Sequence, residues 1–181
     1  VNGAKTVYLA LVTSDRTDEH QNIARDLRER GHVVLPDRQL LMNNAELETA
    51  VKEYLERSDV VIHLLGSNYG MIPEAGTHSV VETQIQLSAT ETAARGVERM
   101  IWLPNELADA EEKQARFIER LRIDPATYEK TDFVEGTFEI FKGLVIEHFT
   151  EEKSRVDTAV QDDSGDGPPT VYLMAPPDDE Q

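Results

Sequence analysis

The chain of 181 residues contains no cysteine, which excludes disulfides, iron–sulfur clusters and thiolate zinc sites. Basic residues are also scarce, because 18 Lys and Arg stand against 35 Asp and Glu, for a formal net charge of -17. Such a charge repels nucleic acids and anionic membranes, so we expect neither as a partner. No apolar run reaches the roughly 18 residues of a membrane span, and no signal-peptide pattern opens the chain. The sequence therefore predicts a soluble, cytoplasmic protein.

Short apolar runs alternate with amphipathic segments along most of the chain. The runs that predict strands are residues 6–12, 32–36, 59–65, 99–103 and, more weakly, 132–134. Strands that are apolar throughout are typical of parallel sheets covered on both faces. Between them, apolar residues recur at helical spacing, as in Leu47, Val51 and Leu55. Five strands alternating with five helices predict an α/β fold, a flavodoxin-like doubly wound five-stranded parallel sheet with the first strand central.

Composition divides the chain into an α/β domain over residues 1–150 and an acidic segment after it. Residues 151–169 are predicted to form a flexible linker, because acidic residues dominate there and Gly and Pro cluster near its end. Within residues 170–181, the tetrapeptide Thr170–Leu173 repeats Thr6–Leu9 letter for letter. This repeat is either the truncated start of a second α/β domain or a chance match.

Several catalytic motifs found on such folds are missing. The chain has no G-x-G-x-x-G, no G-x-x-x-x-G-K-[ST] and no G-x-S-x-G, so dinucleotide fingerprint, P-loop and serine hydrolase are not supported. Its five histidines form no metal-binding motif, and we expect no metal site. His63, in the middle of a predicted strand, is expected to be a hydrogen-bonded core residue.

The loop and helix over residues 66–86 carry the most informative polar residues. Ligands of such sheets bind beyond the carboxyl ends of the strands, and a helix is predicted from about Ser79 to Ala94. On it, four polar residues share an arc of about 100°: Ser79, Glu82, Thr83 and Gln86. The helix N-terminus favours an ionised Glu82, which would suit an oxocarbenium-like transition state at a ribose C1′. Alternatively, Ser79-x-x-Glu82 is a capping box, in which the Glu only bonds a backbone N–H.

Three strings in order carry a family resemblance: VYLALVTSDRTDEHQNIARDLRERGHVVLPDRQL, DVVIHLLGSNYG and SVVETQIQLSA. Together they resemble the bacterial branch of Toll/interleukin receptor (TIR) domains, over about residues 5–150. The resemblance implies the TIR fold and an NAD+ glycohydrolase (NADase), which releases nicotinamide and ADP-ribose or cyclic ADP-ribose. NAD+ would be a substrate, with no separate cofactor. Such domains act as effector modules of bacterial immunity or signalling and are activated by self-association.

The same resemblance implies a catalytic residue, a first loop that contains Ser14 and Asp15, and a mobile loop. Glu82 matches the family's catalytic glutamate, and a mobile loop that closes the site corresponds to residues 36–43. Tyr69 and Trp102 lie at the ends of predicted strands. Either ring could stack on nicotinamide or adenine, or could instead pack under a loop. The Arg38 guanidinium could bind the pyrophosphate of NAD+ or remain a solvated charge. The predicted substrate-binding residues are Ser14, Asp15, Arg38, Tyr69, Ser79 and Trp102.

Two other functions fit the same residues. Nucleoside deoxyribosyltransferases share this sheet, begin with a similar VYLA (residues 7–10), and use a glutamate against an N-glycosidic bond, so nucleosides would replace NAD+. A non-catalytic TIR assembly or adaptor domain would use its loops for recruitment, with Glu82 only as a cap.

Overall fold

The computed structural model describes residues 3–107 and 109–161, with side chains as far as residue 150. Five parallel strands form one sheet in the order β2-β1-β3-β4-β5. The strands are β1 (Thr6–Leu9), β2 (Val33–Leu35), β3 (Val60–Leu64), β4 (Glu98–Pro104) and β5 (Thr131–Gly136). With β1 between β2 and β3, this order confirms the predicted flavodoxin-like sheet.

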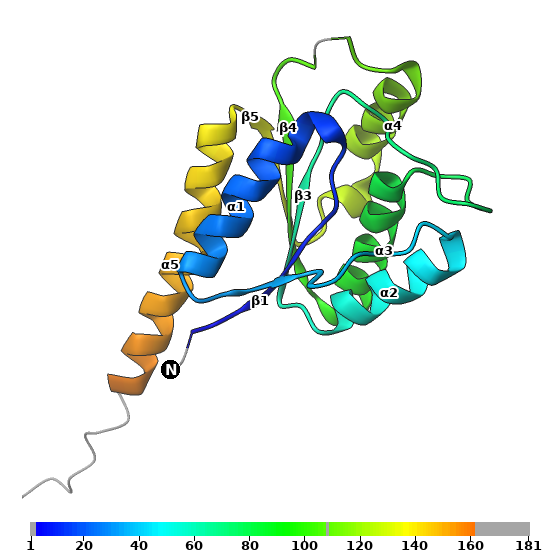
Figure 1. Cartoon of the computed structure of the whole chain (residues 1–181). Helices are drawn as coiled ribbons and strands as arrows, with labels where there is room; N and C mark the ends of the chain where they lie inside the picture. Colours follow the sequence, from blue (N-terminus) through cyan, green and yellow to red (C-terminus); the bar gives the residue numbers. More distant parts are fainter. Residues whose placement is uncertain (1–2, 108, 162–181) are drawn as a thin grey trace, which may run out of the picture.

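Helices cover both faces of the sheet (Figure 1). The α-helices are α1 (Thr17–Glu29), α2 (Asn44–Glu56), α3 (Val80–Arg95), α4 (Glu112–Ile123) and α5 (Phe138–Gln161). Two short 3-10 helices, η1 (Ser14–Arg16) and η2 (Pro125–Thr127), follow β1 and α4. Helices α1 and α5 lie on one face, and α2, α3 and α4 lie on the other.

The alternation of side chains along each strand explains why the strands are apolar throughout. In β1, Val7 and Leu9 pack with α1 and α5, whereas Tyr8 packs with α2. All three side chains are fully buried. The pattern repeats in β4, where Met100 and Trp102 face α5 and Ile101 faces α3 and α4.

Two polar side chains are buried on the face beneath α3 and α4. His63 of β3 lies 2.9 Å from Ser88 Oγ through its Nε2 atom, as the sequence led us to expect of a core histidine. Burial, together with the charge of Arg99, lowers the pKa of His63 to about 3. The guanidinium of Arg99, at the start of β4, is buried on the same face.

The end of the described chain differs from the expectation. Helix α5 continues to Gln161, so residues 151–161 are helical rather than the start of a flexible linker. This stretch contains no Gly or Pro and several good helix formers. The rest of the predicted linker, residues 162–169, and the repeat within residues 170–181 lie outside the described residues. In the part of the chain that the structure describes, no helix is long and apolar enough to cross a membrane.

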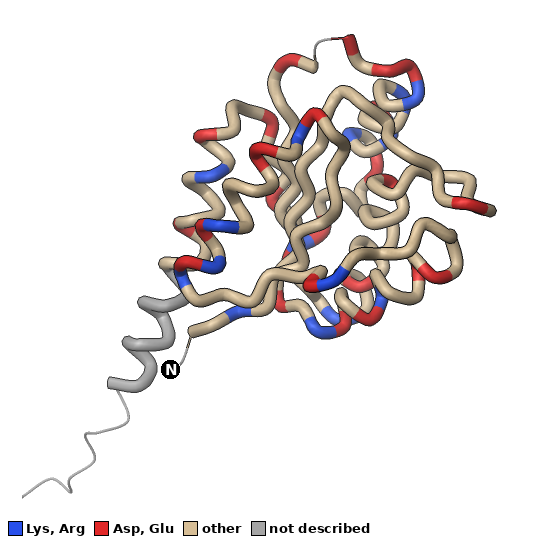
Figure 2. Tube along the Cα trace, viewed as in Figure 1, with Lys and Arg blue, Asp and Glu red and all other residues tan. Residues whose placement is uncertain are grey.

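Charge is distributed widely over the helices and loops. Figure 2 shows acidic and basic positions interspersed along α1, α2 and α4, while the strands are mostly uncharged. Arg99 of β4 is a charged residue that is buried within the sheet.

Candidate functional site

The loop after β1 is joined to the loop after β3 by one carboxylate. Asp15 Oδ2 accepts a hydrogen bond from the Ser67 N–H at 2.8 Å, and its Oδ1 accepts one from Asn68 Nδ2 at 3.2 Å. Partial burial alone would raise the pKa of Asp15, but hydrogen bonds from Thr13 and Ser67 and the charge of Arg16 lower it overall. The structure therefore gives Asp15 a role in holding two loops together at the carboxyl edge of the sheet.

Glycine allows these loops to approach each other closely. A Cβ atom on Gly66 would lie 2.3 Å from Asp15 Oδ2, and one on Gly70 would lie 2.8 Å from Thr13 Cγ2. Gly70 also has a φ of 86°, which favours glycine. Side chains at these positions would force the two loops apart.

Ser79 begins α3 as its N-cap. Its backbone is extended, and its Oγ accepts a hydrogen bond from the Glu82 N–H at 3.2 Å. The second half of the predicted capping box is replaced, because the Ser79 N–H donates to the Tyr69 hydroxyl at 3.3 Å. The Glu82 carboxylate is thus released from capping and is used elsewhere.

The Glu82 carboxylate is buried and held by groups from three elements. Its Oε2 accepts a hydrogen bond from the Tyr69 hydroxyl at 2.5 Å. Its Oε1 accepts one from Arg120 Nη2 of α4 at 2.8 Å and a longer one from Gln86 Nε2 at 3.4 Å. His78 Nε2 lies 3.9 Å from the same oxygen. The Glu82 side chain is only 3% exposed, whereas that of Arg120 is 57% exposed.

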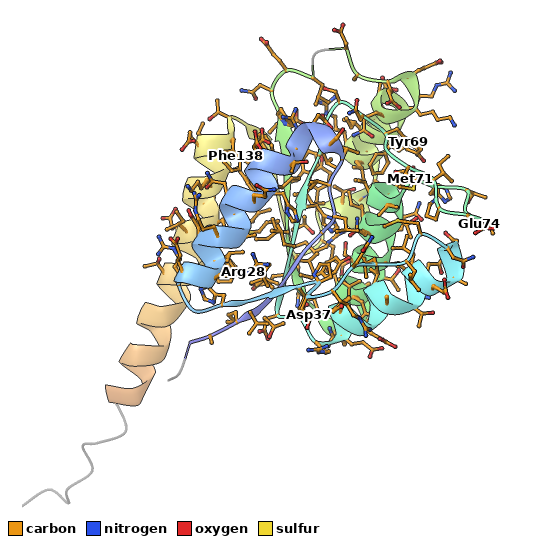
Figure 3. The ribbon with its side chains drawn as sticks, in the orientation of Figure 1. Arg28, Asp37, Tyr69, Met71, Glu74 and Phe138 are labelled. Carbon is orange, nitrogen blue, oxygen red and sulfur yellow. The ribbon has the colours of Figure 1, made fainter. Side chains whose placement is uncertain are left out.

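Tyr69 is fixed as the donor to this carboxylate. Burial and the hydrogen bond to Glu82 raise the pKa of the Tyr69 hydroxyl, so it keeps its proton. Its ring packs edge-on against Phe117 of α4, with centroids 6.4 Å apart. The Lys113 ammonium lies 6.0 Å from the centre of the same ring. In Figure 3, Tyr69 lies near α3 and α4, with Met71 and Glu74 further out on the same loop.

A cavity of about 430 Å³ lies beside Glu82, between α3 and α4. We call it the α3–α4 cavity. Its walls are largely apolar, and Arg99 of β4 and the residues of η2 also line it. It is lined by Glu82, Ile85, Gln86, Ala89, Arg99, Phe117, Arg120, Leu121, Ile123, Asp124, Ala126 and Thr127.

A second cavity of about 430 Å³ lies at the carboxyl edge of the sheet, and we call it the edge cavity. The loops after β1 and β3 line it, together with Met42, Glu111 and the first turn of α3. Val80 and Val81 face this cavity, but Glu82 does not. The first turn of α3 therefore separates the two cavities.

The predicted site residues fall into two groups. Tyr69, Ser79 and Glu82 come together at the start of α3. Ser14 is exposed and lines the edge cavity instead, and Asp15 holds the loops next to it. The structure places Ser14 and Glu82 in different cavities, and the cavity beside Glu82 extends to Arg99 at the start of β4.

Arg38 and Trp102 are not brought to Glu82. The Arg38 guanidinium lies 3.7 Å from Glu53 Oε2 and 5.8 Å from the Tyr54 ring centroid, on the α2 side. Trp102 is 2% exposed, packs on Phe138 and Phe141 of α5, and donates its Nε1–H to the Gly136 carbonyl at 3.0 Å. Trp102 lies on the face of the sheet opposite to Glu82, because side chains along β4 point alternately to the two faces. Neither residue lines the α3–α4 cavity.

Sequence reasoning missed the two arginines of the α3–α4 cavity. Arg120 lies in a charged helix with several similar residues, and Arg99 stands at the edge of an apolar run. No local pattern marks either one, because tertiary packing brings both to α3. Among the side chains that the structure describes, in residues 3–107 and 109–150, no group of three or more His, Asp or Glu is arranged to hold a metal ion.

No family model, curated protein or solved structure matches the chain.

Proposed function

We propose that the chain is an N-glycosidase that cleaves the nicotinamide–ribose bond of NAD+, with Glu82 as the catalytic carboxylate. The observation that carries this proposal is the Glu82 side chain, buried and oriented by Tyr69 and Arg120 on the wall of a 430 Å³ cavity. A preorganised carboxylate in a site of low dielectric stabilises a developing cation more strongly than it would in water. The choice of NAD+ among N-glycosides comes from the TIR resemblance.

The reaction needs few other groups. When the C1′–N bond breaks, its electron pair passes to the nicotinamide ring, whose positive charge is thereby neutralised. Positive charge develops on C1′ and the ring oxygen of the ribose, where the Glu82 carboxylate would stabilise it. Water then adds at C1′ and loses a proton, giving ADP-ribose, nicotinamide and H+. No general acid is required for the leaving group.

Arg120 stands on the exposed side of the carboxylate. Its guanidinium bonds Glu82 Oε1 from a side chain that is itself 57% exposed. A long exposed side chain can move away when a ligand enters, at little cost in packing. Substrate binding in this proposal displaces Arg120 from one carboxylate oxygen and leaves Tyr69 on the other.

The test is nicotinamide release from NAD+, followed by chromatography at two protein concentrations. We expect release by the unaltered chain and its loss, by at least about 10²-fold, in Glu82→Gln, because removal of a preorganised charged group costs a factor of this order. Glu112→Gln is the matched control, since Glu112 is exposed on α4, pairs with Arg116 and does not line the cavity. Equal release by Glu82→Gln and the unaltered chain, or no release at either concentration, would disprove the proposal.

Nucleosides form the second arm of this experiment. Their consumption in place of NAD+, lost in Glu82→Gln, would indicate the deoxyribosyltransferase-like function. Absence of both reactions together with self-association would indicate an adaptor.

Self-association is the second part of the proposal. The loop after β2 is joined to the loop after β3, because the Glu74 N–H donates to the Met42 carbonyl at 3.0 Å and the Asn44 N–H donates to the Glu74 carbonyl at 3.0 Å. These joined loops expose Leu41 (62%) and Met71 (60%). Exposed apolar side chains of this size support a contact with another copy of the chain.

A further inference from the structure

The Arg99 guanidinium lies in the wall of the α3–α4 cavity, and not all of its N–H groups are hydrogen-bonded. The residue is 1% exposed and lines that cavity. Its Nε donates to Thr131 Oγ1 at 3.0 Å, and its Nη2 donates to the carbonyls of Ala126 and Thr127. Its Nη1 is buried without a hydrogen-bond partner. Buried N–H groups are nearly always bonded, so this one calls for an acceptor.

The charge of Arg99 also lacks a direct counterion. All its bonded acceptors are neutral oxygens, and no described carboxylate lies within 4.0 Å of it. Asp124 and Glu129 act on it from further away, and Asp124 Oδ1 is already bonded to the Ala126 N–H. Burial of a cation without a partner is costly unless something compensates for the lost water.

We propose that the Arg99 end of the α3–α4 cavity binds a phosphate group. A guanidinium fork matches phosphate oxygens, and Nη1 is the donor that remains for one. Arg120 of α4 also lines the cavity and is a second cation for the same ligand. Ile85, Phe117 and Leu121 offer apolar surface for a ring attached to it. A volume of about 430 Å³ is in the range of small-ligand sites.

This inference rests on the proposed function for the source of the phosphate. Glu82 and Arg99 line one cavity, so a ribose beside Glu82 would direct its attached phosphate along the cavity toward Arg99. The phosphate is then the diphosphate of the dinucleotide substrate. A free phosphate compound that is not cleaved is the other source, and the experiment separates the two.

Calorimetric titration with pyrophosphate and with ADP-ribose tests the binding directly. We expect saturable binding to the unaltered chain and affinity at least tenfold lower in Arg99→Met. Arg122→Met is the matched control, because Arg122 is half-exposed on the same helix as Arg120, pairs with Glu135 and does not line the cavity. No binding to the unaltered chain, or equal affinity in Arg99→Met, would overturn the proposal.

Arg99→Met also removes three hydrogen bonds from β4 to β5 and η2, and could fail to fold. Ala89→Phe avoids this, because Ala89 lines the cavity from α3 and takes no part in the hydrogen bonds of Arg99. A ring there fills the space and leaves the residues that bond Arg99 unchanged. A variant that unfolds cooperatively and has lost ADP-ribose binding supports the proposal. A folded Ala89→Phe that binds ADP-ribose as tightly as the unaltered chain contradicts it.

Nicotinamide release is then compared between NAD+ and nicotinamide riboside, which carries no phosphate. The comparison shows whether the bound phosphate is the diphosphate of the substrate. A KM for NAD+ raised at least tenfold in Arg99→Met, with the riboside unaffected, assigns the site to the substrate's diphosphate. Binding of ADP-ribose that depends on Arg99, without any nicotinamide release, keeps the phosphate site and removes the proposed function. Release of nicotinamide with an unchanged KM in Arg99→Met removes the phosphate site and keeps the function.

Discussion

The closest donor to each oxygen of the Glu82 carboxylate comes from Tyr69 or Arg120, and these two donors differ in kind. Tyr69 is buried and neutral, and its ring is packed against α4. Arg120 is charged and largely exposed. The buried donor therefore fixes the position of the carboxylate, whereas the exposed one can exchange with a ligand or with water. Mutation of each partner should have a different consequence.

Tyr69→Phe removes the donor from Glu82 Oε2 and the acceptor from the Ser79 N–H. We expect the free energy of unfolding to fall by about 1–3 kcal/mol, because a buried carboxylate loses a hydrogen bond. Urea unfolding measures the change. Tyr128→Phe is the control, since Tyr128 is exposed and donates only to the Arg122 carbonyl. Similar losses of unfolding free energy in both variants would show that the Tyr69 hydrogen bond stabilises the fold no more than the exposed one of Tyr128.

His63 makes stability depend on pH. Its folded pKa is about 3, whereas a histidine in an unfolded chain has a pKa of about 6.5. Between these values only the unfolded state binds the proton, so the free energy of unfolding falls as the pH drops below about 6.5, by up to about 1.4 kcal/mol per unit.

Urea unfolding at about pH 7, 6 and 5 measures this slope in the unaltered chain and in His63→Gln. The glutamine can still bond Ser88 but does not titrate. We expect the slope to be smaller in the variant. Parallel slopes in the two proteins would mean that other groups cause the pH dependence.

At the scale of elements, the strands and the order of the sheet could be predicted from sequence. Apolar runs such as the one through Val60 and Leu64 can be satisfied only between two helical layers. The start of α3 was also predictable, because Ser79 and Glu82 lie within one turn. Arg99 and Arg120 were not, since they come from β4 and α4 and only tertiary packing brings them to α3. For Trp102 the sequence suggested a ligand contact, but the alternation of side chains along β4 places its ring in the core against α5.

The junction of the loops after β1 and β3 gives a prediction for Gly66→Ala. Its new Cβ would lie 2.3 Å from Asp15 Oδ2, so the carboxylate must leave the Ser67 N–H. We expect destabilisation by about 1–3 kcal/mol from the crowding and the lost bond. Thermal or urea unfolding measures it.

The double variant Asp15→Ala with Gly66→Ala tests this mechanism. Its destabilisation should be well below the sum of the two single effects, because the crowded atoms are gone. Gly136→Ala is the control, since a Cβ there meets nothing within 4 Å. If the two destabilisations simply add, crowding against Asp15 is not the cause of the Gly66→Ala effect.

At the scale of the whole molecule, association through the joined loops should depend on their apolar side chains. We expect the sedimentation coefficient of the unaltered chain to rise with protein concentration. Replacing Leu41 and Met71 together by Asp should abolish that rise, because burying two charges in a contact is unfavourable. Ile140→Asp is the control, as Ile140 is 58% exposed on α5, away from these loops. A concentration-independent unaltered chain, or a rise that survives the double substitution, would contradict the expectation.

The length of α5 determines where the chain leaves this domain. Its 24 residues span about 36 Å, and in Figure 1 the helix runs back from β5 to the side where β1 begins. Both ends of the described chain therefore emerge beside the amino ends of the strands. Any tether attached there would leave the rim that carries the joined loops accessible to a neighbouring molecule.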